Sequence, residues 1–288
     1  MPLYFRCRKP LLGLYLFGHR GAALRRSGAI TLYFLAIALA SGVSTAAPAR
    51  PTHLTEEAPQ AIVLGFMGGH VAPDDATRNE LIISNRLRAS YPHGVYFEVW
   101  ENRRVEDAHQ KILRLLRDKN SKSHARIILY GHSWGASAVV TLASELKQDG
   151  IPVQLTIQVD SVQKKGQNDR LIPDNVARAI NFYQPDGILR GRSVIAAADP
   201  ARTQILGNFR YAYKEAPSSC NSYPWYERMF IKTHIAIECD PVLWTRIENL
   251  IRDSLGQLDQ STAHAAAETG TLANVAPDDA KHAAQPKN

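Results

Sequence analysis

Residues 126–146 read RIILYGHSWGASAVVTLASEL, and this stretch decides the fold. The run RIILY is apolar and β-branched, which predicts a buried strand, and the run ASAVVTLASEL has no Pro or Gly, which predicts a helix. Between them, GHSWG at 131–135 matches the pattern G-x-S-x-G. A strand, this turn and a helix in succession predict a nucleophile elbow, in which a strained backbone exposes the serine hydroxyl. Gly131 and Gly135 lack a Cβ, so the strand and the helix can approach closely there.

On both sides of this stretch, apolar runs alternate with amphipathic ones. Strands are predicted at 61–66, 95–100, 153–159 and 176–183. Helices are predicted at 74–90, 105–117 and 240–255, the first capped by Asp74 or Asp75 and the last with Pro241 in its first turn. Alternation of this kind predicts an α/β fold, a mostly parallel sheet with helices on both faces.

The segment 187–233 breaks the alternation. It is rich in aromatic and turn residues, among them Tyr211, Tyr223, Trp225 and Phe230. One interpretation is an ordinary hairpin that packs on the sheet, and the other is a wall or lid over a ligand cleft.

With these motifs in place, the chain resembles the α/β-hydrolase superfamily, in particular its lipase-, esterase- and thioesterase-like serine hydrolases. The resemblance covers about Ala61 to Leu255, and the elbow is its most specific part. The segments that carry it are LGFMGG at 64–69, GHSWGA at 131–136, VDSV at 159–162 and THIAIECDP at 233–241. It implies an α/β-hydrolase fold and a catalytic triad that runs Ser, acid, His along the chain.

Ser133 is therefore the predicted nucleophile, and it needs a neighbouring base. After Ser133 the only histidines are His234, His264 and His282, and the last two lie in a polar tail. His234 precedes the closing helix, where the superfamily places its catalytic histidine. His132 precedes the serine, and its side chain is expected to point to the opposite face, which makes it structural.

The acid of the triad has three candidates, each following a predicted strand. Asp160 follows VQLTIQV, Asp186 follows INFYQP and Asp199 follows VIAAA. Asp160 is preferred because VDSV directly succeeds a clean apolar strand, whereas the QPDG around Asp186 is also a plain turn sequence.

An oxyanion hole needs two backbone N–H donors beside the serine. The resemblance implies one from Trp134, the residue after the nucleophile. The other would come from the loop after the first strand, from Phe66 or Met67. Leu64 stands where many relatives carry a His, so the sequence departs from their His-Gly form.

The resemblance implies a serine hydrolase that cleaves a carboxylic ester or thioester of a small or lipid-like acyl substrate through an acyl-serine. The alternatives are a catalytically inactive binding protein on the same fold, or an acyltransferase that uses the same triad. No cofactor is implied. No metal site is predicted either, because the chain has no CxxC or HExxH and its histidines are scattered.

The charge distribution argues against nucleic acid as a partner. The chain has 34 Lys and Arg against 27 Asp and Glu. Residues 1–50 hold seven of the basic side chains and no acidic one, so the remaining 27 basic and 27 acidic residues balance. A neutral body has no electrostatic footprint for a polyanion.

The basic N-terminus is typical of an export signal. Arg25 and Arg26 precede the apolar run AITLYFLAIALA at 29–40, and Ala47-x-Ala49 follows. Twelve apolar residues are short of the roughly 20 that span a bilayer, so a cleaved signal peptide is preferred over an uncleaved membrane anchor. The expected organisation is a signal or anchor at 1–49, a hydrolase domain at 60–256 and a disordered tail at 257–288.

Three cysteines fit an exported protein. Cys7 lies in the segment expected to be removed, which leaves Cys220 and Cys239. In an oxidising compartment these two are expected to form a disulfide. Closing a loop of about 20 residues would stabilise the fold by on the order of 3 kcal/mol.

Overall fold

The computed structural model describes residues 58–272 except 118 and 125, and of residues 119 and 257–272 only the backbone. All of these residues belong to the compact unit Thr55–Asn288. The predicted leader at 1–49, with Cys7, lies outside the described residues.

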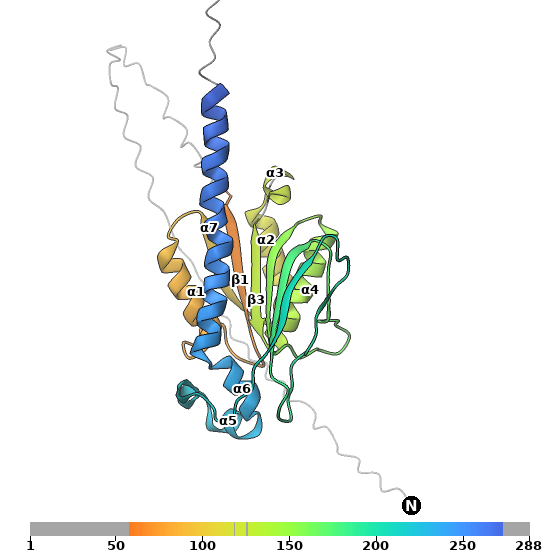
Figure 1. The fold of residues 1–288 in the computed structure, drawn as a ribbon, viewed down its shortest axis with the longest axis vertical. Helices are drawn as coiled ribbons and strands as arrows, with labels where there is room; N and C mark the ends of the chain where they lie inside the picture. The colour runs from red at the N-terminus through yellow and green to blue at the C-terminus, as the bar shows by residue number, and fades with distance from the viewer. Residues whose placement is uncertain (1–57, 118, 125, 273–288) are drawn as a thin grey trace, which may run out of the picture. The chain divides into compact units, whose positions relative to one another are not determined.

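A six-stranded sheet forms the centre of this unit, in the order β2-β1-β3-β4-β6-β8 (Figure 1). Every neighbouring pair in it is parallel. Its strands are β1 (Ala61–Met67), β2 (Val95–Glu101), β3 (Ile127–His132), β4 (Val153–Val159), β6 (Val176–Tyr183) and β8 (Gln204–Arg210). The short strands β5 (Leu171–Ile172) and β7 (Ala196–Ala197) pair with each other outside it.

Helices join the strands. They are α1 (Asn79–Ser90), α2 (Val105–Leu115), α3 (Lys119–Ser123), α4 (Trp134–Gln148), the 3-10 helix η1 (Ser218–Ser222), α5 (Trp225–Phe230), α6 (Lys232–Glu238) and α7 (Pro241–Leu272). Among the described residues no helix combines the length and the apolar character needed to cross a bilayer.

The two faces of the sheet carry different helices, as Figure 1 shows. Side chains alternate across a strand, so Ile62 and Leu64 of β1 pack with α2 and α4, while Ala61 and Val63 pack with α1 and α7. The predicted α/β class, a parallel sheet covered on both faces, is thereby confirmed. Burial of these apolar side chains on both faces is the main term that stabilises the sheet.

The structure differs from the predicted elements in three places. First, α1 begins at Asn79 and not after Asp74 or Asp75. Asp75 instead accepts hydrogen bonds from the backbone N–H of Thr77, at 3.0 Å, and from its hydroxyl, at 2.6 Å. These bonds close a turn before the helix, and Arg78 takes the cap position.

Second, the segment 187–233 is neither a simple hairpin nor only a wall. Its first half returns to the sheet as β8, the edge strand beside β6. Its second half forms η1 and α5, which lie apart from the sheet next to α6 (Figure 1).

Third, α7 runs to Leu272, whereas the sequence predicts a helix that ends at Leu255. The added stretch contains AHAAAET at 263–269, and Ala has the highest helix propensity of any residue. Residues 273–288 lie outside the described residues.

The expected disulfide between Cys220 and Cys239 is present, with the two Cα atoms 5.2 Å apart. It links η1 to the end of α6 and packs with Tyr223 and Ile235 in a small apolar cluster. The bridge therefore closes the segment that contains α5 and α6, which otherwise has little of the main core to hold it.

Candidate active site

Ser133 lies at the turn between β3 and α4, in a backbone conformation that a residue with a side chain rarely adopts. Its φ is 57° and its ψ is −122°. The backbone around it compensates for this strain. Its N–H donates to Val159 O at 2.9 Å, and its carbonyl oxygen accepts from Val162 N at 3.2 Å and Ala136 N at 3.1 Å. The end of β4 and the first turn of α4 thus hold the predicted elbow in place.

Gly131 and Gly135 must be glycines, because any side chain at either position would clash with neighbouring backbone atoms. A Cβ on Gly131 would lie 2.7 Å from the Gly135 carbonyl carbon, and one on Gly135 would lie 2.7 Å from the Phe66 carbonyl carbon. Both are backbone atoms that cannot turn away. The helix carrying Ser133 therefore packs against β1 as closely as backbone allows, which no other residue type permits.

His234 and Asp160 form a buried pair. His234 Nδ1 lies 2.6 Å from Asp160 Oδ2, and the two residues are 2% and 0% exposed. The carboxylate also accepts from Gln184 N at 3.1 Å, Gln184 Nε2 at 2.9 Å and Gly191 N at 2.9 Å. These donors fix the orientation of the carboxylate, which in turn fixes the imidazole ring.

The other two candidate acids lie elsewhere. Asp186 contributes its carbonyl oxygen, which accepts from the Thr233 hydroxyl at 2.7 Å. Asp199 accepts from Ala201 N at 2.9 Å, closing a local turn. Of the three, Asp160 is the one whose carboxylate contacts His234.

A cavity of about 850 Å³ opens over the elbow and is lined by both Ser133 and His234. The loop after β1 forms one wall with Gly68 and Val71, and the segment from Pro224 to Ile235 forms another. In the described part of the chain no hydrogen bond joins Ser133 Oγ to the His234 ring. The two residues belong to different elements and line the same cavity.

The backbone around Ser133 comes from the start of α4 and from the end of β1 and the loop after it. Trp134 begins α4, so its N–H has no acceptor within the helix. Phe66 and Met67 are still inside β1, paired with β2. The backbone beside the serine belongs to Gly68, where a Cβ would meet Ser133 Cβ at 3.3 Å.

Sequence reasoning also missed the residue that holds this loop. Asn102, in the turn after β2, is 4% exposed, and its amide donates to Met67 O at 3.0 Å and to Gly69 O. The one sequence signal for Asn102 is that it is a polar residue directly after a strand. Many ordinary turn residues have the same property, so this signal does not identify it.

His132 is buried, as a structural residue would be, yet it also lines the cavity. Its ring centroid lies 4.4 Å from that of His234. Burial lowers the pKa of His132 well below its ordinary value, and the nearby His234 and Arg78 lower it further. Its imidazole is therefore neutral near pH 7.

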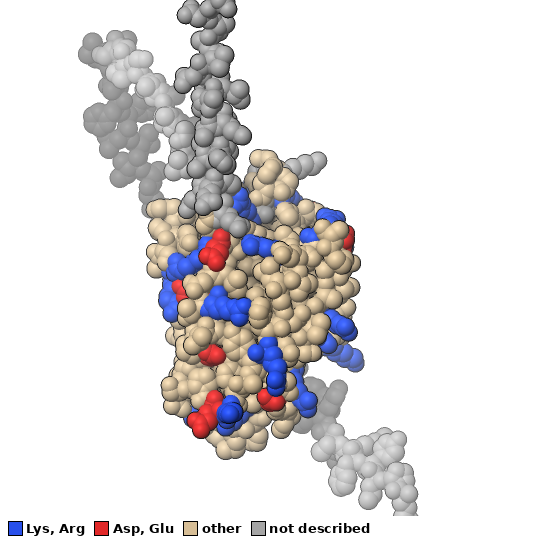
Figure 2. Space-filling view, viewed as in Figure 1, with Lys and Arg blue, Asp and Glu red and all other residues tan. Residues whose placement is uncertain are grey.

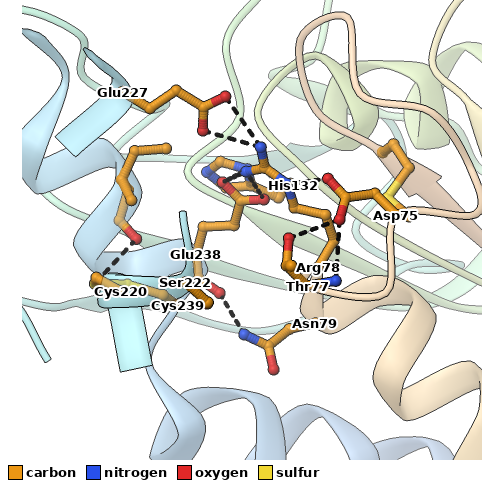
Figure 3. Close-up of polar contacts among 12 residues, drawn as sticks. Asp75, Thr77, Arg78, Asn79, His132, Cys220, Ser222, Glu227, Glu238 and Cys239 are labelled. Carbon is orange, nitrogen blue, oxygen red and sulfur yellow. Dashed lines mark hydrogen bonds and ion pairs between the residues drawn. A yellow bond between two sulfur atoms is a disulfide. The ribbon is translucent and has the colours of Figure 1, made fainter. Parts of the chain in front are cut away.

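Beside His132 lies a charged cluster that the sequence did not reveal (Figure 3). The Arg78 guanidinium donates to Glu238 at 3.0 and 3.2 Å, to Glu227 at 3.0 Å and to Asp75 at 3.2 Å. It also lies 4.4 Å from the centre of the Tyr223 ring. Burial opposes its charge, but Glu238 and Glu227 outweigh this and raise the pKa of Arg78. Arg78 thus ties the start of α1 to both α5 and α6.

The surface in view carries Lys and Arg side chains interspersed with Asp and Glu, without a field of one sign (Figure 2).

No protein-family model matches the chain, and no curated protein matches it in sequence. Among solved structures it is similar to a candidate hydrolase of the alpha/beta superfamily from Xanthomonas campestris pv. campestris, at 15% identity and a TM-score of 0.30, covering 52% of this chain and 87% of that one. It is also similar to a cutinase-like protein from Cryptococcus sp., at 14% identity and a TM-score of 0.31, covering 63% and 97%. An acetyl xylan esterase follows at 12% identity and a TM-score of 0.28, covering 62% and 99%.

These likenesses are too distant to assign the chain to a family. The fold itself follows from the parallel sheet, the strand order and the turn at Ser133, and it is the α/β-hydrolase fold that the sequence predicts.

The contact at Gly135 gives a first prediction. Gly135→Ala places a methyl group against the Phe66 carbonyl, and overpacking of this kind costs about 1–3 kcal/mol or more of unfolding free energy. Urea denaturation measures the loss. The matched control is Gly256→Ala, since a Cβ there meets nothing within 4 Å and Gly256 lies in α7, where Ala is the better helix former. Equal stability of the two variants would contradict the close approach.

Proposed function

We propose that this protein is a serine hydrolase that cleaves a carboxylic ester or thioester through an acyl-serine intermediate. The observation that carries the proposal is the 2.6 Å contact between His234 and Asp160, with His234 lining the same cavity as Ser133. An imidazole that is held by a carboxylate and shares a cavity with a serine at a strained turn supports this proposal, because a serine hydroxyl becomes nucleophilic when such a base takes its proton.

In the proposed mechanism, Ser133 Oγ attacks the acyl carbon and its proton passes to Nε2 of His234. Asp160 keeps the proton of Nδ1 in place and stabilises the imidazolium. The tetrahedral intermediate then collapses, and His234 returns its proton to the departing alcohol or thiol. A water molecule attacks the acyl-serine by the same route, which releases the acid and restores Ser133.

The hydrogen bond between Ser133 and His234 forms in this proposal when substrate binds. Catalytic hydrogen bonds are often long or poorly aligned in a free enzyme and tighten in the substrate complex. The shared cavity supports this, because a substrate bound there would contact both side chains.

The developing oxyanion would be stabilised by the N–H group of Trp134 and by one from the consecutive residues Phe66, Met67 and Gly68. Gly68 joins the two predicted donors as a candidate, because a Cβ on it would lie 3.3 Å from Ser133 Cβ. The α4 N-terminus adds a favourable dipole for negative charge.

The cavity walls support an apolar acyl group as substrate. Val71, Leu189, Ile231 and Ile235 all line it, whereas its charged members lie together around Arg78. Pockets with apolar walls and a few convergent polar groups are typical of small-molecule sites.

The central experiment replaces the nucleophile. Ser133→Ala is expected to lower kcat/KM on nitrophenyl esters by roughly 10³- to 10⁶-fold and to abolish labelling by a fluorophosphonate probe. Ser137→Ala is the matched control, since that serine lies one turn further along α4 with its hydroxyl bonded to Gln167 at 2.7 Å. Labelling that persists in Ser133→Ala, in a protein of unchanged circular dichroism, would refute the proposal.

A second experiment separates the three carboxylates. Asp160→Asn leaves the shape of the side chain but offers His234 the wrong partner, and is expected to reduce kcat by roughly 10²- to 10⁴-fold. Asp186→Asn and Asp199→Asn should retain activity near that of the wild type, since neither carboxylate contacts His234. A larger loss in either of them than in Asp160→Asn would assign the acid elsewhere.

We further propose that the chain is exported through an N-terminal signal peptide and that residues 60–256 are its catalytic domain. The disulfide Cys220–Cys239 supports an oxidising compartment. N-terminal sequencing of the exported protein is expected to begin after Ala49. A mature chain that starts at Met1 would instead indicate an uncleaved anchor.

A further inference from the structure

Three side chains from distant parts of the chain meet below the elbow. Glu80 comes from the first turn of α1, His132 from the end of β3 and Glu238 from the end of α6. One carboxylate oxygen or ring nitrogen from each lies within 4.8 Å of those of the others. The residues are 0%, 2% and 2% exposed, and His132 and Glu238 also line the cavity.

Four polar atoms in this cluster have no hydrogen-bond partner. They are both carboxylate oxygens of Glu80 and both ring nitrogens of His132. His132 Nδ1 lies 3.4 Å from Glu238 Oε2 but is not aligned for a hydrogen bond. Buried polar groups almost always find a partner, and those that do not commonly indicate a bound ion or water.

The cluster also has more acidic than basic side chains. Four carboxylates gather around one guanidinium, those of Glu80, Glu238, Glu227 and Asp75 around Arg78. In the described part of the chain Arg78 is the one permanent cation paired with them, and Glu80 has no ion pair. A second cation would relieve the repulsion between Glu80 and Glu238.

His132 can supply a metal ligand, because neither of its ring nitrogens has a partner and a neutral imidazole has one nitrogen with a free lone pair.

We propose that Glu80, His132 and Glu238 form a binding site for a divalent cation, and that Zn²⁺ is the ion that suits it. One imidazole nitrogen with two carboxylate oxygens is a donor set that Zn²⁺ accepts readily, with a water molecule as the fourth ligand. Mg²⁺ and Ca²⁺ prefer oxygen ligands alone. The ion reaches the site from the cavity, which His132 and Glu238 both line.

Arg78 is compatible with this site. Its Nη1 donates to both oxygens of Glu238, and each oxygen keeps a second lone pair for the metal ion. Hydrogen bonds of this kind orient a ligand carboxylate. The site could not be predicted from a sequence motif, because its ligands are at positions 80, 132 and 238 and lie close together only in the folded chain.

A bound ion would tie α6 to α1 and to the end of β3. Since α6 also carries His234, the ion would steady the element that presents the proposed base. Metal binding does not depend on hydrolysis, so the site can be tested whether or not the proposed function is correct.

The test uses the full exported chain, stripped with EDTA and then given ZnCl₂. Elemental analysis after gel filtration is expected to find one Zn²⁺ per chain. The Tm should rise by roughly 5–10 °C at a hundredfold excess of Zn²⁺ over its Kd. Glu80→Gln should lose the bound ion and the rise in Tm.

The chain offers a matched control. Glu106, His109 and Glu145 form a second group of the same residue types, but it lies at the surface and His109 Nε2 already contacts Asp149 at 2.6 Å. Glu106→Gln should retain Zn²⁺. Loss of Zn²⁺ from Glu106→Gln and not from Glu80→Gln would overturn the assignment, as would less than one tenth of an equivalent in the wild type.

X-ray absorption of the wild-type protein covers the case in which Glu80→Gln does not fold. One nitrogen ligand at about 2.0–2.1 Å with oxygen ligands around it is the expected first shell. A first shell without imidazole would overturn the proposal. So would a metal-stripped chain that binds no Zn²⁺ while Glu80→Gln is more stable than the wild type, because Glu80 would then simply hold a proton.

Discussion

The close approach of β1 to the start of α4 is the constraint on which the site depends. With glycine at 131 and 135, backbone packs on backbone, and the turn between them has no room to relax. Ser133 is held in its left-handed conformation as a result, and the same contact brings Gly68 beside it. At an ordinary helix start, a serine hydroxyl would accept a hydrogen bond from a backbone N–H of the first turn. The Ser133 side chain makes no such bond to α4 and lines the cavity instead. One packing contact, between β1 and the start of α4, therefore positions both the loop after β1 and the Ser133 hydroxyl.

A second strained residue lies at the same edge of the sheet as Ser133, where the strands have their carboxyl ends. Asp160 follows β4 with a φ of 43°, directly beside the elbow, and its N–H donates to Phe182 O at 2.7 Å. Gly191 packs so closely on Asp160 that a Cβ would clash with the Asp160 backbone. Strain at the ends of two adjacent strands is expensive, of order 1–3 kcal/mol for each residue, and persists only where the surroundings overdetermine it. Here the hydrogen bonds from β4, β6 and the loop at 184–191 do so.

Much of this was predictable from the sequence, for a physical reason. The apolar runs and their alternation reflect local periodicity, so the strands β1 to β6 of the main sheet and the helices α2 and α4 were predicted within a few residues. The position of Ser133 in a turn between a strand and a helix was predictable because that turn is local, and the position of Asp160 because it directly follows a strand. The positions of Gly68 and Asn102 near the serine were not predictable, since strand register decides which backbone lies there. The Arg78 cluster was hidden entirely: a buried ion pair between residues 160 positions apart leaves no local pattern.

The buried charges have a further consequence for His234. Replacing buried ion pairs by apolar residues often leaves stability unchanged or improved, so stability alone is a weak reason for Arg78 and Glu238 to lie here. His234 and Glu238 are four residues apart in α6 and therefore share one face of that helix. Arg78 donates a hydrogen bond to Glu238 at one end of this face, and Asp160 contacts the His234 ring at the other. The disulfide closes the segment behind them. A short helix held at both ends cannot rotate without breaking one of the two contacts, so the charges below the elbow limit the positions that the imidazole above it can take.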